Sequence, residues 1–389
     1  MAKHLKVIIL ANAFYNGGKN FWGGGDSRCF NIINRFPEDR FVFCVMSNHD
    51  GIRVYSRNIK HKFEKILQSS LFGNLYLDYA WRSLSGTFRL WRSLKLPLKE
   101  KVLIYSTSDF FPDVLPPFFL KNKNRRWIQV IHHLYPDPRK REGSYFRNFI
   151  AYWLQKFSFF LIKKRADKIV VVNPLVKEAL INFGIEEKRI LSSSNGIDLN
   201  YFHQIKPNKK YDGLFLGRLN RSKGVFDLPE IWKHVCEKVP KAKLAVLGEG
   251  DDNMVKALKK KIAEGGLTDR IDILGFMEND EAFSLLKGSK LFIFPSHEEG
   301  FGIVLAEAGA CNVPAVAWNL PVYKAVFGSS ICTARRDSFE EFANIAITLL
   351  LDEVRRSEVG NKVAQFITRY SWDEVANVER SMMMNLLLP

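Results

Sequence analysis

Two carboxylates eight residues apart are the side chains of this sequence best placed to act on a ligand. Glu299 and Glu307 lie in the stretch PSHEEGFGIVLAEAGACNVP, residues 295–314, on either side of a Gly-Phe-Gly turn. A helix that begins at Gly302 would carry Glu307 one turn inside it and leave Glu299 in the loop before it. The two carboxylates could form an acid/base pair. They could also bind two hydroxyl-bearing parts of one ligand, while the free N–H groups at the helix start bind an anionic part.

Two cations in an earlier loop favour the second interpretation. Arg218 and Lys223 lie in GRLNRSKG, residues 217–224, directly after an apolar run and between two glycines. Two cations in a glycine-framed loop at the end of a strand suit a diphosphate. Glu299 and Glu307 would then bind hydroxyl groups at opposite ends of that diphosphate ligand.

The elements that must position these residues are short apolar runs alternating with longer amphipathic ones. This alternation predicts an α/β fold in which helices wrap parallel sheets, with ligands at the carboxyl ends of the strands. Strands are predicted at residues 6–11, 41–46, 102–106, 127–132 and 168–172, and then at 213–217, 244–248, 271–275, 291–294 and 315–318. The 389 residues exceed what one core usually supports, so two domains are expected, with a linker near residues 193–210.

Two features of the first half follow predicted strands. Glycines at 17–18 and 23–25 come after the first strand, where they would let backbone N–H groups approach a phosphate or sugar, or form a purely structural turn. His132 and His133 end the strand WIQVIHH. An imidazole there could donate to a sugar hydroxyl or move a proton, although a core histidine is the alternative.

The five cysteines are scattered and form no CxxC pair, which argues against a disulfide framework or a zinc site. The run LKVIILA is too short for a signal peptide, and no uncharged run approaches the ~20 residues of a membrane span. A reducing, cytoplasmic location is therefore expected.

The net charge of +17 is concentrated in one half of the chain. Residues 1–195 hold 33 Lys and Arg against 15 Asp and Glu, whereas the remainder is nearly neutral. Trp81, Leu84, Phe88, Trp91 and Leu94 form one helical stripe, and a second aromatic-rich segment spans residues 146–165. Basic flanks around such segments suit a helix lying in an anionic membrane surface; alternatively, both stripes pack on the sheet. No motif for nucleic acid accompanies the charge, so nucleic acid is not expected as a partner.

The strongest resemblance to a known family lies in the second half. FLGRLNRSKG, VLGEGDD, ILGFMENDEAFSLLKGSKLFIFPS and HEEGFGIVLAEA, in this order and spacing, resemble the retaining glycosyltransferases of family 4, which have the GT-B fold. In the first half, IHHLYP and ADKIVVVN are similar to segments of that family. Family members commonly have His-Asp where this chain has His132-His133, so His132 is matched to the family histidine and His133 is left open.

The resemblance implies two Rossmann-like domains that face each other across a cleft. Residues 1–197 would form the acceptor-side domain, completed by a crossover helix within 371–389, and residues 198–370 would form the domain that binds a nucleotide-diphosphate sugar. The implied catalytic residues are His132, Arg218, Lys223 and Glu299. The implied donor-binding residues are Gly24, Gly25, Gly217, Phe276, Met277, Gly300, Phe301, Gly302, Ile303 and Glu307.

Each group has a stated role under this resemblance. Arg218 and Lys223 would hold the diphosphate and Glu307 the ribose hydroxyls. Glu299 and the N–H groups of residues 301–303 would hold the sugar and phosphate, and backbone near Phe276 would contact the base. Stabilising the departing diphosphate with cations and a helix start requires no metal and no cofactor. The leaving phosphate would itself take the acceptor's proton, so neither glutamate would be a nucleophile.

The expected function is a retaining transfer of a sugar from a nucleotide-diphosphate donor to an acceptor hydroxyl. The acceptor would be a lipid-linked or cell-surface polysaccharide precursor, and the protein would be cytoplasmic or peripheral on the inner face of the cell membrane. Two alternatives remain: a nucleotide-sugar 2-epimerase of the same fold, and a basic membrane- or glycan-binding module with a degenerate donor site.

Overall fold

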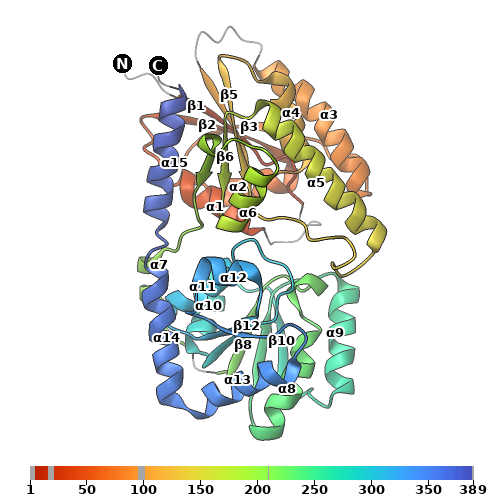
Figure 1. Cartoon of the computed structure of the whole chain (residues 1–389), viewed down its shortest axis with the longest axis vertical. Helices are drawn as coiled ribbons and strands as arrows, with labels where there is room; N and C mark the ends of the chain where they lie inside the picture. Colours follow the sequence, from red (N-terminus) through yellow and green to blue (C-terminus); the bar gives the residue numbers. More distant parts are fainter. Residues whose placement is uncertain (1–4, 16–21, 95–100, 209, 388–389) are drawn as a thin grey trace. The chain divides into compact units, whose positions relative to one another are not determined.

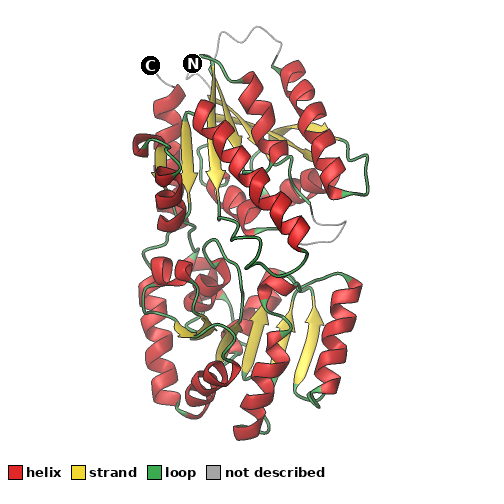
Figure 2. Cartoon of the chain, turned by 45° about the vertical axis from the view of Figure 1, so that its right-hand side comes forward, coloured by secondary structure: helices red, strands yellow, loops and turns green. Residues whose placement is uncertain are grey.

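The chain divides into two compact units, each built on one parallel sheet with helices on both faces (Figures 1 and 2). The computed structural model describes residues 5–15, 22–94, 101–208 and 210–387. Met1–Gly196 and Trp372–Pro389 form the first unit, and Ile197–Ser371 forms the second. The C-terminal residues are therefore part of the first unit.

The first unit contains a seven-stranded sheet in the order β3-β2-β1-β4-β5-β6-β7, in which every neighbouring pair is parallel. Its strands are β1 (Leu5–Leu10), β2 (Phe41–Asn48), β3 (Phe63–Gln68), β4 (Val102–Ser106), β5 (Arg125–Ile131), β6 (Lys168–Val171) and β7 (Ile190–Ser192). Its helices are α1 (Gly24–Ile33), α2 (His49–Asn58), α3 (Leu75–Ser93), α4 (Phe111–Leu120), α5 (Tyr145–Arg165), α6 (Pro174–Asn182), the 3₁₀ turn η1 (Glu187–Arg189) and α15 (Trp372–Leu387).

Alternate residues of the β1 strand point to opposite faces of this sheet, and each face has its own core. Val7 and Ile9 pack with α1, α2 and α15. Ile8 and Leu10 pack on the opposite face with Leu90 of α3. Trp127 of β5 belongs to a third core, which contains residues of α4, α5 and α6. The strands are apolar on both sides because helices cover both faces.

The second unit contains a six-stranded parallel sheet in the order β10-β9-β8-β11-β12-β13. Its strands are β8 (Gly213–Leu216), β9 (Leu244–Leu247), β10 (Ile271–Gly275), β11 (Leu291–Phe294), β12 (Ala315–Trp318) and β13 (Cys332–Ala334). Its helices are α7 (Leu199–Gln204), η2 (Arg221–Lys223), α8 (Asp227–Lys238), α9 (Asp252–Glu264), α10 (Asn279–Gly288), α11 (Ile303–Ala310), α12 (Pro321–Phe327), α13 (Phe339–Leu351) and α14 (Glu353–Ile367).

The strand order of the second unit reverses between β8 and β11. β8, the first strand of this unit, lies beside β11, the fourth. From β8 the sheet continues through β9 to β10 on one side, and from β11 it continues through β12 to β13 on the other. Ligands of doubly wound sheets bind outside the carboxyl ends of the strands at such a switch point. The loops that follow β8 and β11 contain Arg218, Lys223 and Glu299, and Glu307 follows in α11, so the topology brings these residues to one edge of the sheet.

All ten predicted strands form, with boundaries that differ by no more than two residues. Three others were missed. β7 and β13 have only three residues each, which is too short for a periodic pattern. β3 is an edge strand with the sequence FEKILQ, and its charged side chains interrupt any apolar run.

The aromatic stripe of α3 does not pack on the sheet along most of its length. Leu94 is buried, but Leu84, Phe88 and Trp91 are exposed. The helix instead turns a polar and small-residue face inward, where the buried Arg82 pairs with Asp78. The alternative in which both stripes lie against the sheet is therefore wrong for α3.

α15 is held in the first unit by a buried ion pair. Glu379 pairs with Arg28 of α1, and both side chains are almost fully excluded from solvent. Glu379 also accepts hydrogen bonds from Tyr105 (2.8 Å) and Ser193 (2.8 Å). Because one carboxylate serves three partners from separate segments, its loss would leave a buried cation without a counter-charge.

We therefore expect Glu379→Ala to lower the free energy of unfolding of the first unit by about 3–5 kcal/mol. Asp373→Ala is the matched control on the same helix, since the Arg35–Asp373 pair is exposed on the Asp side and should contribute less than about 1 kcal/mol. Urea titrations of both variants would measure the difference. Equal losses would contradict the anchoring role of Glu379.

Candidate functional site

The loops after β8 and β11 are in direct contact. Gly224 ends the 3₁₀ turn η2 with a left-handed backbone (φ 67°), and a Cβ atom there would overlap the backbone carbonyl of Pro295. The backbone N–H of His297 donates to the Ser222 carbonyl oxygen (2.8 Å), and the Ser296 Oγ lies 3.1 Å from the same oxygen. The close approach depends on glycine at position 224.

This contact brings Lys223 and Glu299 together. Lys223 Nζ pairs with Glu299 Oε1, and both side chains are largely buried. The Ser296 hydroxyl donates to the same carboxylate oxygen (3.0 Å). Asn220 fixes the turn, because its side chain accepts a hydrogen bond from the Lys223 backbone N–H (3.1 Å). Two of the four residues predicted to be catalytic therefore form one ion pair.

Arg218 lies in the same loop but is exposed, and it forms no ion pair with any residue in the described part of the chain. Its neighbour Gly217 donates a backbone hydrogen bond to Leu247 of β9 (3.1 Å). A Cβ atom at Gly248 would overlap the Gly217 carbonyl, so the loops after β8 and β9 also touch through glycine. The Arg218 side chain therefore faces solvent, while contacts of the neighbouring Gly217 with β9 and Gly248 fix the backbone that carries it.

α11 begins where the sequence predicted. Gly302 is the N-cap residue in a left-handed conformation (φ 89°), which glycine adopts without strain, and no side chain caps the helix. Gly300 and Phe301 precede it, and the Phe301 ring is buried edge-to-face against Phe327 and Tyr370. The first N–H groups of α11, beginning at Ile303, are therefore available to an anion.

Glu307 is half-buried on α11, and no cation among the described residues pairs with it. Burial raises the pKa of its carboxyl to about 7. The Tyr201 hydroxyl of α7 donates a hydrogen bond to Asp280 at the start of α10 (2.6 Å). Burial raises the pKa of Tyr201, and the negative charge of Glu307 contributes to the same shift. A carboxyl with a raised pKa beside the carboxyl ends of the strands is a candidate functional group.

Phe276 and Met277 follow β10 and are half-buried. They lie in the loop that leads into α10, the helix whose first turn contains Asp280. The Tyr201 hydroxyl therefore contacts the first turn of α10, the helix that follows this loop.

In the first unit, the structure brings Gly25 and His132 together. A Cβ atom at Gly25, in the first turn of α1, would lie 2.8 Å from His132 Nε2. That nitrogen is 2.8 Å from the Thr107 carbonyl oxygen, to which it donates in the neutral ring. Burial, with a smaller contribution from Arg28, lowers the pKa of His132 to about 4, so the imidazole is neutral at physiological pH.

Asp113 fixes the loop that follows β1. Its carboxylate accepts hydrogen bonds from the backbone N–H groups of Asn12 (2.6 Å) and Ala13 (3.2 Å), and burial raises its pKa to about 7. Of the predicted glycine loop, Gly24 and Gly25 lie at the start of α1. The glycines at 17 and 18 lie outside the described residues.

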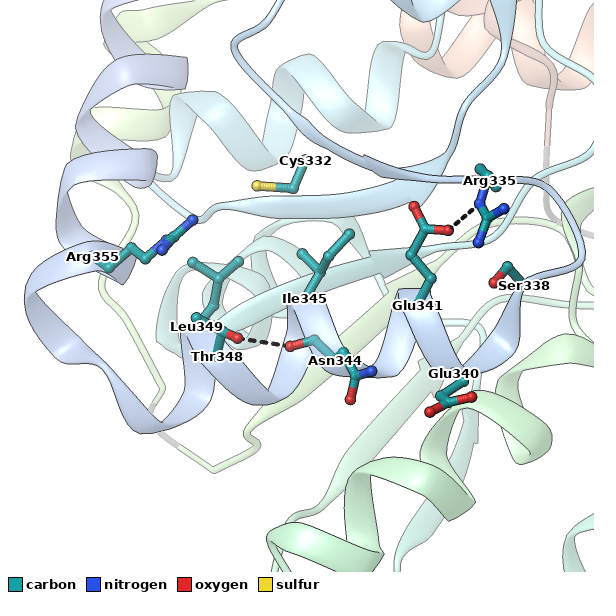
Figure 3. Close-up of a pocket in the computed structure, with 10 residues that line it drawn as sticks. All are labelled: Cys332, Arg335, Ser338, Glu340, Glu341, Asn344, Ile345, Thr348, Leu349 and Arg355. Atoms are coloured by element: carbon teal, nitrogen blue, oxygen red, sulfur yellow. Dashed lines mark hydrogen bonds and ion pairs between the residues drawn. The ribbon is translucent and has the colours of Figure 1, made fainter.

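A surface pocket of about 480 Å³ lies elsewhere in the second unit, between β13, α13 and α14 (Figure 3). Figure 3 shows Arg335 paired with Glu341 at one end and Arg355 at the other. None of the predicted site residues lines this pocket.

Four residues around the site were missed from the sequence. Ser296 supports Glu299, and Tyr201 joins Asp280 to the region of Glu307. Asp227 accepts hydrogen bonds from the Trp318 indole (2.9 Å) and pairs with His297 (2.8 Å) behind the loop. Ser296 and His297 could have been found from the sequence, because they lie in the motif PSHEE beside Glu299. Tyr201 lies in a segment that resembles a linker, so no sequence signal points to it.

Comparison with known families decides the class of this site. The family model described as "Glycosyl transferases group 1" matches residues 198–366. The model described as "Glycosyltransferase Family 4" matches residues 22–201. The chain belongs to the family 4 glycosyltransferases.

Two relatives of this glycosyltransferase are each 25% identical to it. It is 25% identical over 259 residues to the capsular polysaccharide biosynthesis glycosyltransferase CapM of Staphylococcus aureus. That match covers 60% of the chain and 65% of CapM, just under two thirds of its length. The alpha-galactosylglucosyldiacylglycerol synthase of Streptococcus pneumoniae is 25% identical over 335 residues, covering 77% of the chain and 84% of that enzyme.

Solved structures confirm the predicted GT-B fold of this glycosyltransferase. HepE from Anabaena, crystallised with UDP and glucose, superimposes with a TM-score of 0.74 at 18% identity. The superposition covers 98% of this chain and 100% of HepE.

Substitution of Gly224 would test the contact that joins the two site loops. Gly224 and Gly266 have the same left-handed φ of 67°, but nothing lies within 4 Å of a Cβ atom at Gly266. We expect Gly266→Ala to cost about 1–2 kcal/mol through backbone strain alone. Gly224→Ala should cost clearly more, because its methyl group must displace the Pro295 carbonyl.

Thermal and denaturant unfolding of the two variants would measure this difference. If Gly224→Ala were no more destabilising than Gly266→Ala, the close approach of the loops after β8 and β11 would be contradicted.

Proposed function

We propose that this glycosyltransferase moves a sugar from a nucleoside-diphosphate sugar to an acceptor hydroxyl with retention of anomeric configuration. The observation that carries the proposal is the Lys223–Glu299 pair at the switch point of the second sheet, in the loops adjoining Arg218 and the start of α11. This arrangement combines cations for an anionic group with carboxylates for hydroxyl groups.

The donor's diphosphate would change the partner of Lys223. In this structure Glu299 neutralises Lys223. A bound diphosphate provides a stronger counter-charge, so the ammonium would turn toward it and release Glu299 to accept hydrogen bonds from sugar hydroxyls. Arg218, which is exposed, would bind the same diphosphate. The buried pair thus holds both side chains in position before the donor arrives.

The same groups would act on the departing diphosphate. Breaking the anomeric C–O bond leaves oxocarbenium character on the sugar and negative charge on the diphosphate. Lys223, Arg218 and the N–H groups at the start of α11 would stabilise that charge in place, and one such donor is worth about 3–4 kcal/mol. We propose that these groups meet the charge without a metal ion or cofactor. The leaving phosphate oxygen would then take the acceptor's proton on the same face of the sugar.

Glu307 would bind the ribose hydroxyls of the nucleotide. Its raised pKa of about 7 means that the free carboxyl is partly protonated at neutral pH. Two hydroxyl donors would favour the carboxylate form, so donor binding would release a proton and strengthen as the pH rises through about 7. The loop of Phe276 and Met277 would contact the base through its backbone.

His132 would contact a sugar hydroxyl. Because Nε2 donates to the Thr107 carbonyl and the ring is neutral, Nδ1 is the atom left to accept a hydrogen bond. The acceptor would be a lipid-linked or cell-surface polysaccharide precursor, a choice supported by the resemblance to CapM, a capsular polysaccharide biosynthesis glycosyltransferase, and to the alpha-galactosylglucosyldiacylglycerol synthase. We propose that the enzyme acts in the cytoplasm, at the inner face of the cell membrane.

Substitution of Lys223 tests the proposal most simply. We expect Lys223→Ala to lower kcat/KM for sugar transfer about 10²- to 10³-fold, because it removes a charge aligned with the leaving group. Arg221→Ala is the matched control: Arg221 lies two residues away in the same turn but rests over the Phe226 ring. Its activity should stay within about threefold of wild type, since its charge is screened by solvent.

Product analysis from a nucleotide-sugar panel would supply the readout, with unfolding curves confirming that both variants fold. Full activity of Lys223→Ala would contradict the diphosphate role. A 2-epimer formed from the donor alone would contradict transfer and favour an epimerase.

A further inference from the structure

The exposed large apolar side chains of this protein are unevenly distributed. In the described part of the second unit, only Leu351 and Val354 are of this kind. In the first unit, two helices carry twelve. They are Tyr76, Leu77, Leu84, Phe88 and Trp91 on α3, and Tyr145, Phe146, Phe149, Trp153, Leu154, Phe157 and Phe160 on α5.

The exposed residues of α5 form one continuous face. Phe146, Phe149, Trp153, Phe157 and Phe160 follow one another at spacings of three and four, a stripe about 21 Å long at 1.5 Å per residue. Phe146 is 70% exposed and Trp153 is 56% exposed. Amphipathic surface helices of globular proteins usually bury such a stripe against the core. The aromatic stripe of α5 faces solvent instead.

The inner face of α5 is anchored by polar contacts. Gln155 donates to Asp109 (2.8 Å) and to the His133 carbonyl (3.0 Å), and it accepts from the Tyr135 N–H (2.8 Å). The buried Phe159 and Ile162 complete the packing on the sheet. The outward aromatic face is therefore a fixed feature of a well-anchored helix.

α3 presents a second outward stripe in the same layer. Leu77, Leu84, Phe88 and Trp91 share one face of this helix at helical spacing. α3 packs against α4, and α4 packs against α5. Both stripes thus belong to the three-helix layer that covers one face of the first sheet (Figure 1).

The charge on this layer has one sign. α5 contains five basic residues and no acidic one. The acidic residues of α3 and α4 are Asp78 and Asp113, and both are buried. Lys164 lies 4.1 Å from the centre of the Phe160 ring, so a cation is interleaved with the aromatic face.

We propose that the outer face of α5, extended by that of α3, docks on an anionic lipid bilayer. Phenylalanine and tryptophan rings would enter the headgroup and acyl boundary, while the lysine and arginine side chains extend to lipid phosphates. No helix among the described residues is long and apolar enough to cross a bilayer. The contact is therefore that of a helix lying in the membrane surface.

A second copy of this chain fits the surface less well. A symmetric dimer through α5 would place the same patch against itself, so the exposed Arg147 and Lys164 of one copy would meet those of the other, with no acidic residue on either helix. Like charges opposed across an interface disfavour association. Anionic headgroups supply the missing counter-charge.

Docking of α5 would also place part of the proposed site close to a lipid-linked acceptor. Gln155 ties α5 to the loop that follows His132, so docking would hold this loop near the lipid surface. This consequence rests on the proposed function, whereas the docking itself does not. A binding assay without donor or acceptor therefore tests docking independently.

The experiment is vesicle flotation of the full chain at low and high salt, with phosphatidylcholine alone or mixed equally with phosphatidylglycerol. We expect binding only to the anionic vesicles, weakening as salt rises. Phe146→Ser combined with Trp153→Ser should lower the partition coefficient roughly tenfold or more. Leu351→Ser combined with Val354→Ser, equally exposed in the second unit, should leave it unchanged.

Charge reversal supplies a second, matched pair of variants. Arg147→Glu with Lys164→Glu should weaken binding at least about tenfold, whereas Lys256→Glu with Lys259→Glu on α9 changes the same net charge and should have less than about a twofold effect. Equal binding to both vesicle types, or equal binding by the α5 variants and their controls, would overturn the proposal. So would a dimer that Phe146→Ser with Trp153→Ser dissociates, or binding to single-stranded nucleic acid in place of vesicles.

Discussion

The chemistry of the second unit depends on the contact between the loops that follow β8 and β11. Gly224 allows the backbone to pass against the Pro295 carbonyl, and that approach places Lys223 beside Glu299. A largely buried ion pair of this kind is costly to desolvate, so its net contribution to stability is small. The Lys223–Glu299 pair holds a cation and a carboxylate in fixed positions at the switch point of the sheet, where ligands of such folds bind.

The first unit uses buried charge for a different purpose. Arg28 and Glu379 join α1 to α15, and Asp113 holds the loop after β1 by its backbone. The inner sides of α3 and α5 pack on the opposite face of the sheet through buried residues such as Arg82, Leu90 and Phe159, and the aromatic residues on their other sides face outward. The excess positive charge of this half of the chain lies beside them.

Much of this could be predicted from the sequence, for a physical reason. Parallel sheets produce short apolar runs, and the loops at their carboxyl ends carry glycines and charged residues together, so Arg218, Lys223, Glu299 and the helix start at Gly302 were recognisable. The family resemblance added the match of His132.

What could not be predicted depends on three-dimensional packing. The charged edge strand β3 has no apolar pattern, and nothing local indicates that Tyr201 reaches Asp280 across 79 positions. The outward orientation of α3 was not evident either, because a helical stripe does not show which side meets the sheet. The buried Arg82 and Leu90 and the close packing of Gly86 against Asn12 show which side that is.

The exchange of partners at Lys223 is the central claim of this account. A crystal structure with a bound nucleoside-diphosphate sugar would test it most directly. We predict that Lys223 Nζ lies within hydrogen-bond distance of a phosphate oxygen, with Glu299 turned to the sugar hydroxyls and Glu307 on the ribose. A donor bound with the Lys223–Glu299 pair intact, or bound away from the start of α11, would contradict the account.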